Sequence, residues 1–327
     1  MLISKATGLL VLGIVLLYVG AEALVEAASR LSVGLGVDAA VAGVTVVAFA
    51  TTMPELFVGV LSGLGFATDM GIGAVIGSNI ANLGLVLGIA ALIRPLSVDR
   101  DVVRRHVPFM IAAAVLVVGL GYDGVIGPLD GLALLGLLGG FTWYLIRGVR
   151  AEDADADPDG DGESVVADGG EPAAAGAAVD GIQSRDVGYL AGGLALLFVG
   201  SRALITGGRD VLIQFGFSYR LVGLTVLAFG TSLPELAASV VAAVRGQAQF
   251  SVGNVVGSNI YNVLAVVGVL ALMVPIRIAP GMRAFDFPAL LAFTVGAVAL
   301  MLRGRSVSRI DGALLVAGYA VFFHLLL

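Results

Sequence analysis

The sequence predicts an all-α membrane protein in which ten transmembrane helices form two inverted five-helix repeats. Composition is the first reason: 58% of the 327 residues are hydrophobic and 13% are charged, about half the charged share of a soluble domain. Ten apolar runs are the second reason, because each can cross a bilayer as a helix of about 20 residues. The third reason is a motif that occurs at residues 43–56 and again 180 positions later.

The ten apolar runs fall into two groups of five, separated by one long polar segment. They cover residues 6–29, 38–64, 70–93, 106–123 and 126–146, then 187–209, 217–243, 249–273, 284–302 and 309–326. The first run is similar to a secretory signal peptide, but it matches residues 186–209 and is therefore assigned to the fold. The predicted divisions are a first half at 1–148, a linker at 149–185 and a second half at 186–327.

The duplication keeps one register over two separate motifs. GVTVVAFATTMPEL at 43–56 corresponds to GLTVLAFGTSLPEL at 223–236, and GSNIAN at 77–82 corresponds to GSNIYN at 257–262. Each copy contains five predicted spans, and an odd number places the second copy in the membrane with the opposite orientation. Such inverted repeats are common in secondary transporters, whose substrate sites lie near the middle of the membrane.

The distribution of arginine and lysine predicts which side faces the cytoplasm. Loops on one side hold twelve of the 18 basic residues, and loops on the other side hold six. The larger group consists of Arg30, Arg94, Arg100, Arg104, Arg105, Arg147, Arg150, Arg185, Arg245, Arg303, Arg305 and Arg309. We therefore expect a multi-pass protein of the cell membrane, with both termini extracellular and the 149–185 linker cytoplasmic.

The linker is strongly acidic. Ten of the 24 acidic residues lie within 152–180, where there is no lysine or arginine. High charge and few large apolar residues predict a disordered segment. A weak calcium loop is the alternative, because Asp155, Asp157 and Asp159 match its start, although Val166 replaces the glutamate required at its twelfth position.

Each copy of the first motif places a glutamate in an apolar stretch, directly after a proline. A charged carboxylate there costs about 2.5–3.5 kcal/mol on insertion scales, so two at equivalent positions indicate a functional site. Proline lacks an N–H, which frees carbonyl groups of the preceding turn to face a cavity or bind a cation. The candidate ligands from this motif are Thr51, Thr52 and Glu55, and then Thr231, Ser232 and Glu235.

The second motif adds hydroxyl and amide oxygens. Ser78 and Asn82 lie four residues apart and hence on one helix face, as do Ser258 and Asn262. Hydroxyl, amide and carboxylate oxygens are hard ligands, which suit Na⁺ and Ca²⁺ rather than soft transition metals. Taken singly, such residues are often kinks or interhelical hydrogen bonds, but their recurrence with two glutamates favours a cation site at the repeat interface.

Two further groups of residues are interpreted structurally. The glycines that precede the second motif are spaced for close helix packing: Gly73, Gly77, Gly253 and Gly257. In the first span, Glu22 corresponds to Arg202 of the second repeat. Glu22 and the nearby Glu26 are therefore expected to form ion pairs or face headgroups, with a role in transport as the alternative.

Composition also argues against several other functions. The chain has no cysteine, which excludes disulfides and thiolate metal sites, and two histidines are too few for an ordinary zinc site. It has no basic cluster with interleaved aromatic residues, so nucleic acid is not an expected partner. We expect no cofactor and no obligatory protein partner, only the lipid bilayer and the transported ions.

The two motifs resemble the α-repeats of the sodium/calcium exchanger family, in its prokaryotic type, within the cation/Ca²⁺ antiporter superfamily. GTSLPEL at 230–236 and GNVVGSNI at 253–260 match the family pattern closely, and the resemblance covers both halves but not the linker. It implies ten helices, inverted repeats, alternating access and movement of the first and sixth helices past a fixed core.

By position, the resemblance implies that Glu55 and Glu235 share a central Ca²⁺ site with the carbonyl groups of Thr51 and Thr231. The hydroxyl residues implied in flanking Na⁺ sites are Thr52, Ser78, Ser232 and Ser258, with Asn82 and Asn262 at the remaining central positions.

The sequence departs from the family pattern at four positions. Ala50, Thr52 and Ala74 stand where the family has glycine, serine and asparagine, and Asn262 stands where many prokaryotic relatives have aspartate. The last difference leaves two carboxylates in the whole site and argues against dependence on K⁺.

The expected function is secondary active antiport of Na⁺ and Ca²⁺, without enzymatic catalysis. Exchange of Ca²⁺ for H⁺ is the alternative, because buried carboxylates can take up protons. Two weaker rivals are an intramembrane aspartyl protease, whose Gly-x-Gly-Asp motif is absent, and a passive cation channel, which would not show saturable counter-transport.

Overall fold

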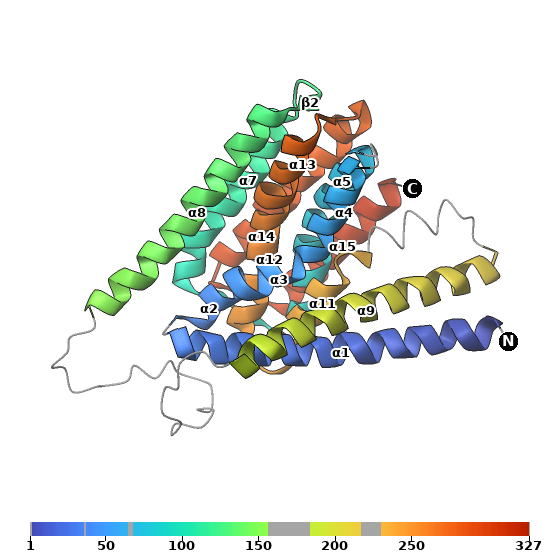
Figure 1. Ribbon diagram of the computed structural model, residues 1–327, viewed down its shortest axis with the longest axis horizontal. Coiled ribbons are helices and arrows are strands. Elements are labelled where there is room, and N and C mark those ends of the chain that lie inside the picture. The colour runs from blue at the N-terminus through green and yellow to red at the C-terminus, as the bar shows by residue number, and fades with distance from the viewer. Residues whose placement is uncertain (1, 36, 65–67, 156–183, 217–229, 327) are drawn as a thin grey trace.

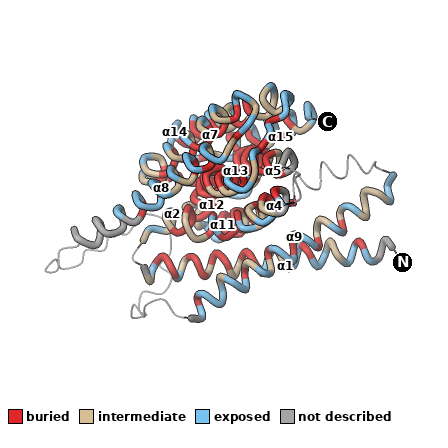
Figure 2. Tube along the Cα trace, turned by 45° about the horizontal axis from the view of Figure 1, so that its top comes forward, coloured by how far each residue is buried: buried red, intermediate tan, exposed pale blue. Residues whose placement is uncertain are grey.

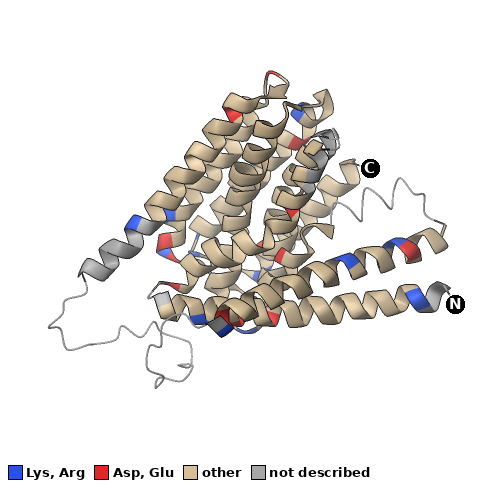
Figure 3. Ribbon diagram, viewed as in Figure 1, with Lys and Arg blue, Asp and Glu red and all other residues tan. Residues whose placement is uncertain are grey.

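The structure is a computed structural model that describes residues 2–35, 37–64, 68–155, 184–216 and 230–326. Within these ranges the chain is almost entirely helical (Figure 1). Nine helices of the described part are long and apolar enough to cross a membrane, and a shorter apolar helix covers Leu233–Val244. Long stretches of the helices are uncharged, and many charged residues lie near helix ends, although a few acidic residues lie in the middle of the bundle (Figure 3). The predicted all-helical membrane fold is therefore confirmed.

In the described part of the chain, five of the ten predicted spans are built from several helical segments, some of them π-helical (η). The first half contains α1 (Leu2–Leu35), α2 (Ala39–Ala42), η1 (Gly43–Val47), α3 (Ala48–Thr51), α4 (Met53–Leu64), α5 (Thr68–Ala81), η2 (Asn82–Val86), α6 (Leu87–Ile93), β1 (Leu96–Ser97), η3 (Val102–His106), α7 (Val107–Leu120), β2 (Val125–Ile126) and α8 (Pro128–Asp155). The second half contains α9 (Ser184–Gln214), α11 (Leu233–Val244), α12 (Ala248–Tyr261), η4 (Asn262–Val267), α13 (Gly268–Met273), β3 (Ile276–Arg277), η5 (Met282–Asp286), α14 (Phe287–Leu302), β4 (Ser306–Val307) and α15 (Arg309–Leu326).

The helices around the linker extend further than the sequence predicted. α8 continues to Asp155 and α9 begins at Ser184, so residues 149–155 of the predicted linker are helical. Residues 156–183 lie outside the described residues, as does the 217–229 part of the predicted seventh span.

Two short antiparallel strand pairs reveal the relation between the halves. β1 pairs with β4, and β2 pairs with β3. Residues 96–97 of β1 correspond by the repeat to residues 276–277 of β3, so each pair joins one strand from each half. The two pairs lie at opposite ends of the molecule, because η3 and α7 run between β1 and β2. In an inverted repeat, corresponding strands of the two halves lie at opposite ends of the molecule, so each strand pairs with a strand of the other half. The predicted inverted arrangement is therefore confirmed.

The two longest helices, α1 and α9, lie side by side and cross the rest of the bundle obliquely (Figures 1 and 2). Glycines allow their backbones to meet: a Cβ on Gly20 would lie 2.8 Å from the carbonyl oxygen of Gly193, and one on Gly13 would lie 2.9 Å from that of Gly200. Gly13 corresponds to Gly193 and Gly20 to Gly200, so the two contacts are equivalent. They are related by the pseudo-two-fold axis that relates the two inverted repeats.

α12 forms the centre of the bundle, where buried residues are concentrated (Figure 2). It packs directly on the backbone of η1, since a Cβ on Gly257 would lie 2.4 Å from the carbonyl oxygen of Val44. Gly253 makes a similar approach, with its Cβ position 2.7 Å from the carbonyl oxygen of Ala40. Close packing is thus confirmed for these two glycines. Gly73 and Gly77 show no such approach to described residues, and the positions equivalent to 40–48 fall within 217–229.

Candidate cation-binding site

Both glutamates lie at the start of a helix that follows a break. The second predicted span is interrupted at Thr52, with α3 ending at Thr51 and α4 beginning at Met53. The second repeat has a turn at residues 231–232 before α11 begins. Pro54 and Pro234 are the second residues of their helices, and because proline has no N–H they cannot donate a hydrogen bond to a carbonyl group of the preceding turn. Each carboxylate therefore sits in the first turn of a helix, at its positive end.

The two carboxylates are buried together without a neutralising partner. Glu55 is 2% exposed and Glu235 is fully buried. None of their four oxygen atoms accepts a hydrogen bond from a described residue, and the two groups are close enough to repel each other. Removing one partner from a buried ion pair costs about 3–5 kcal/mol because it leaves an uncompensated charge. The arrangement therefore calls for a cation between the helix breaks.

Hydroxyl groups from both repeats surround the carboxylates. The Thr51 and Ser258 hydroxyl oxygens are 3.4 Å apart, and those of Ser78 and Thr231 are 3.0 Å apart. These two contacts are equivalent under the pseudo-two-fold axis, since each joins a first-motif threonine to a second-motif serine of the other repeat. Ser78 lies beside Glu55 and Thr51 lies beside Glu235. The structure thus joins six of the ten predicted ligands across the repeat interface.

The other four predicted ligands are buried, and their polar side-chain atoms have no hydrogen-bond partner among described residues: Thr52, Ser232, Asn82 and Asn262. Thr52 and Ser232 occupy the helix breaks themselves. The asparagines lie one turn beyond the second-motif serines and begin the π-helical segments η2 and η4. Such segments often occur at functional sites, because they alter the regular carbonyl ladder.

Asn254 is a site residue that the sequence reasoning missed. Its side-chain carbonyl accepts a hydrogen bond from the Thr51 hydroxyl (3.1 Å), and its amide nitrogen donates to the Glu235 backbone carbonyl (3.2 Å) and to Ser239 (2.9 Å). The available signal was its spacing, four and eight residues before Ser258 and Asn262. We expect Asn254 to orient the Thr51 hydroxyl so that its lone pairs face the bound ion.

An apolar cleft of about 480 Å³ lies between α9 and the helix breaks. It is lined by Leu194, Leu197 and Phe198 on α9, by Met53 and Phe57 on α4, and by Thr51, Pro54 and Pro234 at the helix breaks. α1, in contrast, packs directly over α2–α3 and α11 through an apolar patch made of Ala21, Leu24, Val25 and Ala28, which we call the α1 seal. The site is therefore approached by a cleft beside α9 and covered on the α1 side.

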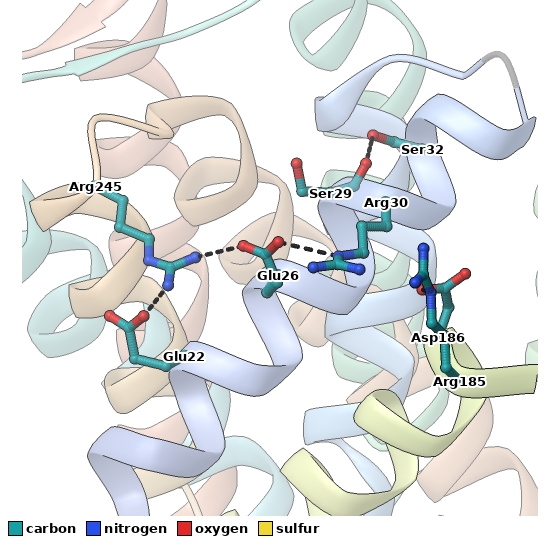
Figure 4. A network of polar contacts seen from close by, with 8 residues as sticks. All are labelled: Glu22, Glu26, Ser29, Arg30, Ser32, Arg185, Asp186 and Arg245. Carbon is teal, nitrogen blue, oxygen red and sulfur yellow. Dashed lines mark hydrogen bonds and ion pairs between the residues drawn. The ribbon is translucent and has the colours of Figure 1, made fainter. Parts of the chain in front are cut away.

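Glu22 and Glu26 form ion pairs away from the site (Figure 4). Arg245, at the end of α11, pairs with Glu22 and also with Glu26, at 3.1 Å, while Glu26 pairs with Arg30 at 3.0 Å. The ion-pair interpretation of these two glutamates is therefore confirmed. These ion pairs hold α1 against the end of α11 where Arg245 lies. The second repeat has Arg202 at the position of Glu22, so it cannot form the same ion pair with an arginine.

Replacing Arg245 with Gln is expected to loosen α1 from α11. Partly exposed ion pairs contribute about 0.2–1 kcal/mol each, so losing two should make local opening roughly two- to thirtyfold more frequent. Amide hydrogen exchange should show this increase in residues 20–30 and 241–246. Arg277→Gln, at the opposite end, is the control. Unchanged protection in Arg245→Gln would mean that the ion pairs do not hold α1 in place.

Comparison with known proteins identifies similar chains over the full length. The pattern of the family described as sodium/calcium exchanger protein matches residues 5–147 and 186–327. The inner membrane protein YrbG of Escherichia coli is 33% identical over 98% of this chain and 96% of its own length. The sodium/calcium exchanger MaX1 of Methanosarcina acetivorans is 28% identical over 97% of each chain. A solved structure of the sodium/calcium exchanger from Methanococcus jannaschii superposes with a TM-score of 0.78, at 27% identity, over 98% of this chain and 97% of that one.

Proposed function

Because this chain belongs to the sodium/calcium exchanger family, we propose that it exchanges Na⁺ for Ca²⁺ across a membrane by alternating access. The observation that carries the proposal is the pair of buried, unpartnered carboxylates of Glu55 and Glu235 at the repeat interface. Two carboxylates balance one Ca²⁺ or two Na⁺, so either load neutralises the site. The protein is a transporter, and Na⁺ and Ca²⁺ are its substrates.

The ligands follow from the chemistry of the site. Glu55 and Glu235 hold Ca²⁺ between the helix breaks, with the carbonyl groups of Thr51 and Thr231 beside them. Na⁺ uses the same carboxylates together with hydroxyl and amide oxygens, from Thr52, Ser78, Asn82, Ser232, Ser258 and Asn262. All of these oxygens are hard ligands suited to both ions. In support, the polar atoms of both carboxylates and of four of these side chains have no hydrogen-bond partner among the residues that the structure describes.

Sharing of the carboxylates explains exchange rather than leak. An empty site leaves two negative charges in a low-dielectric interior, at a cost of several kcal/mol each. The empty carrier should therefore switch between its two facing states far more slowly than a loaded one. Release of Ca²⁺ on one side must be followed by binding of Na⁺ before the site returns to the other side.

The orientation follows from the arginine distribution. The end with Arg94, Arg245 and Arg303 faces the cytoplasm, because positive charge is retained on that side. Both termini are then extracellular and residues 156–183 cytoplasmic, in a cell-membrane protein that needs no obligatory protein partner. Cytoplasmic modification of the exposed Arg100→Cys and extracellular modification of the exposed Tyr122→Cys would support this orientation, and the reverse pattern would invert it.

Proteoliposomes loaded with Na⁺ and diluted into Na⁺-free medium should accumulate radioactive Ca²⁺. We expect uptake to require internal Na⁺, to saturate with Ca²⁺ and to ignore an imposed pH gradient. Liposomes without protein and liposomes loaded with K⁺ are the controls. Uptake driven by a proton gradient without Na⁺ would replace the proposal with Ca²⁺/H⁺ exchange, and non-saturating uptake would indicate a channel.

A further inference from the structure

One face of α12 carries polar side chains along most of its length. Gln247, Ser251, Asn254, Ser258 and Asn262 follow one another at spacings of three or four residues. The four that follow the N-cap residue Gln247 share one helix face. The last two are predicted ligands of the candidate site, and Asn254 contacts that site through Thr51. The first three, which we call the α12 polar face, extend from that site to the end of α12 next to Arg245.

Two groups on this face are buried without a partner. Ser251 is fully buried and its hydroxyl makes no hydrogen bond with a described residue, and the same is true of the side-chain oxygen of Gln247. A buried polar group left unpaired costs about 1–3 kcal/mol. Polar residues inside a membrane segment commonly mark the route of an ion, and such a route would explain why these groups are kept.

The fold itself does not require these polar side chains. In the first repeat, the positions that correspond to Ser251 and Asn254 are occupied by Gly71 and Ala74. Ser239, which receives a hydrogen bond from Asn254, corresponds to Gly59. The first repeat builds the same helices with residues that have no polar side chain, so the polar face is particular to the second repeat and to one end of the molecule.

The polar face lies between the elements that the α1 seal covers. Asn254 reaches Thr51 at the end of α3 on one side and Ser239 on α11 on the other. The α1 seal belongs to one hydrophobic cluster with residues of the same two elements, including Ala50 and Ala242, and Arg245 ties α1 to α11 at the end of the face where Gln247 lies. Movement of α1 away from α11 would therefore expose the polar face from the end where Arg245 lies.

We propose that transported cations move between this end of the molecule and the Glu55/Glu235 site along the α12 polar face. The inference rests on the proposed exchange function and adds the route on one side. Amide and hydroxyl oxygens replace part of the hydration shell in steps, and Asn254 passes the ion to Thr51. The α12 polar face carries no charged side chain, so it should bind Ca²⁺ only weakly. Weak binding is needed along a route, because the ion must be able to leave each position.

The natural chain has no cysteine, which permits a direct accessibility test. Ser251→Cys and Gln247→Cys are compared with Val252→Cys, which lies next to Ser251, is 1% exposed and packs in the hydrophobic core. A cationic, membrane-impermeant methanethiosulfonate reagent is added to one side of sealed vesicles during exchange. Modification is measured by intact mass, and Arg100→Cys and Tyr122→Cys report which side the reagent reaches.

We expect Ser251→Cys and Gln247→Cys to be modified at least tenfold faster than Val252→Cys, and only from the side that modifies Arg100→Cys. Modification should also lower the transport rate of each variant relative to its own unmodified sample. Equal rates for all three positions, or modification from the Tyr122 side, would overturn the route. Each rate is taken from monodisperse protein. If Ser251→Cys does not fold, Gln247→Cys is compared with its neighbour Ala248→Cys, which is equally half-buried and packs against the hydrophobic core, and this pair decides the outcome.

The labelling and transport measurements test the cation route and the exchange function separately. If the natural chain shows no Na⁺-driven Ca²⁺ uptake but the labelling pattern holds, the exchange function is wrong and the accessible face stands. If uptake is Na⁺-driven but the three cysteines label alike, the exchange function stands and the route is wrong.

Discussion

Replacing Glu235 with Gln should reduce Na⁺-driven Ca²⁺ uptake by at least about a hundredfold. The substitution keeps the shape of the side chain but removes one of two charges that face the ion from a fully buried position. Losing one partner of a buried charge interaction costs roughly 3–5 kcal/mol, and each 1.4 kcal/mol is a tenfold change. Uptake of radioactive Ca²⁺ by Na⁺-loaded proteoliposomes measures the loss, and Glu55→Gln should behave alike.

Asp123→Asn is the matched control, since it makes the same chemical change on an exposed loop residue. It should retain uptake within about twofold, as surface substitutions usually change energies by less than 0.5 kcal/mol. Full uptake by Glu235→Gln would show that the Glu235 carboxylate is not needed to bind the ion. Loss in Glu235→Gln but not in Glu55→Gln would show that the two repeats contribute unequally.

The second large effect is expected at Gly257, where a methyl group should disrupt packing at the centre of the bundle. Its Cβ would lie 2.4 Å from the Val44 carbonyl oxygen and 2.5 Å from the Ala48 Cβ, so α12 must move away from η1 and α3. Overpacking of this kind costs about 1–3 kcal/mol. The same shift separates both Ser258 and Asn254 from Thr51. We therefore expect Gly257→Ala to lower both the thermal midpoint in detergent and Ca²⁺ uptake.

Gly136→Ala is the control for Gly257→Ala. In α8, no atom of a described residue lies within 4 Å of the added Cβ position, and alanine is about 0.8–1.0 kcal/mol better than glycine within a helix. This variant should keep or raise the thermal midpoint. An unchanged midpoint in Gly257→Ala would show that α12 and η1 are less tightly packed than the structure indicates.

The repeats and the candidate ligands could be predicted because they leave local signals. Pro54 and Pro234 mark the helix breaks, since a missing N–H acts on the preceding turn whatever the surroundings. A constant offset identifies equivalent residues, so Thr51 and Ser258 could be assigned to one site before any contact was known. The contacts of Thr51 with Ser258 and of Ser78 with Thr231 agree with that assignment.

Other features depend on contacts between distant segments and leave little trace in the sequence. The π-helical segments that begin at Asn82 and Asn262 have the same apolar composition as the α-helices around them. Strand pairs of two residues are too short to have a period. The partner of Glu22 lies 223 positions away at Arg245, and the role of Asn254 depends on Thr51 and Ser239, which reach it from two other helices.

The exchanged strand pairs have a consequence for how the protein is made. While the ribosome is still producing the second half, β1 and β2 have no partners, because β4 and β3 are supplied by segments near residues 306 and 276. The first half therefore inserts as an incomplete unit, and its two strands find their partners only when the second half has been made. Two halves expressed as separate polypeptides should accordingly be degraded singly and recovered together when co-expressed.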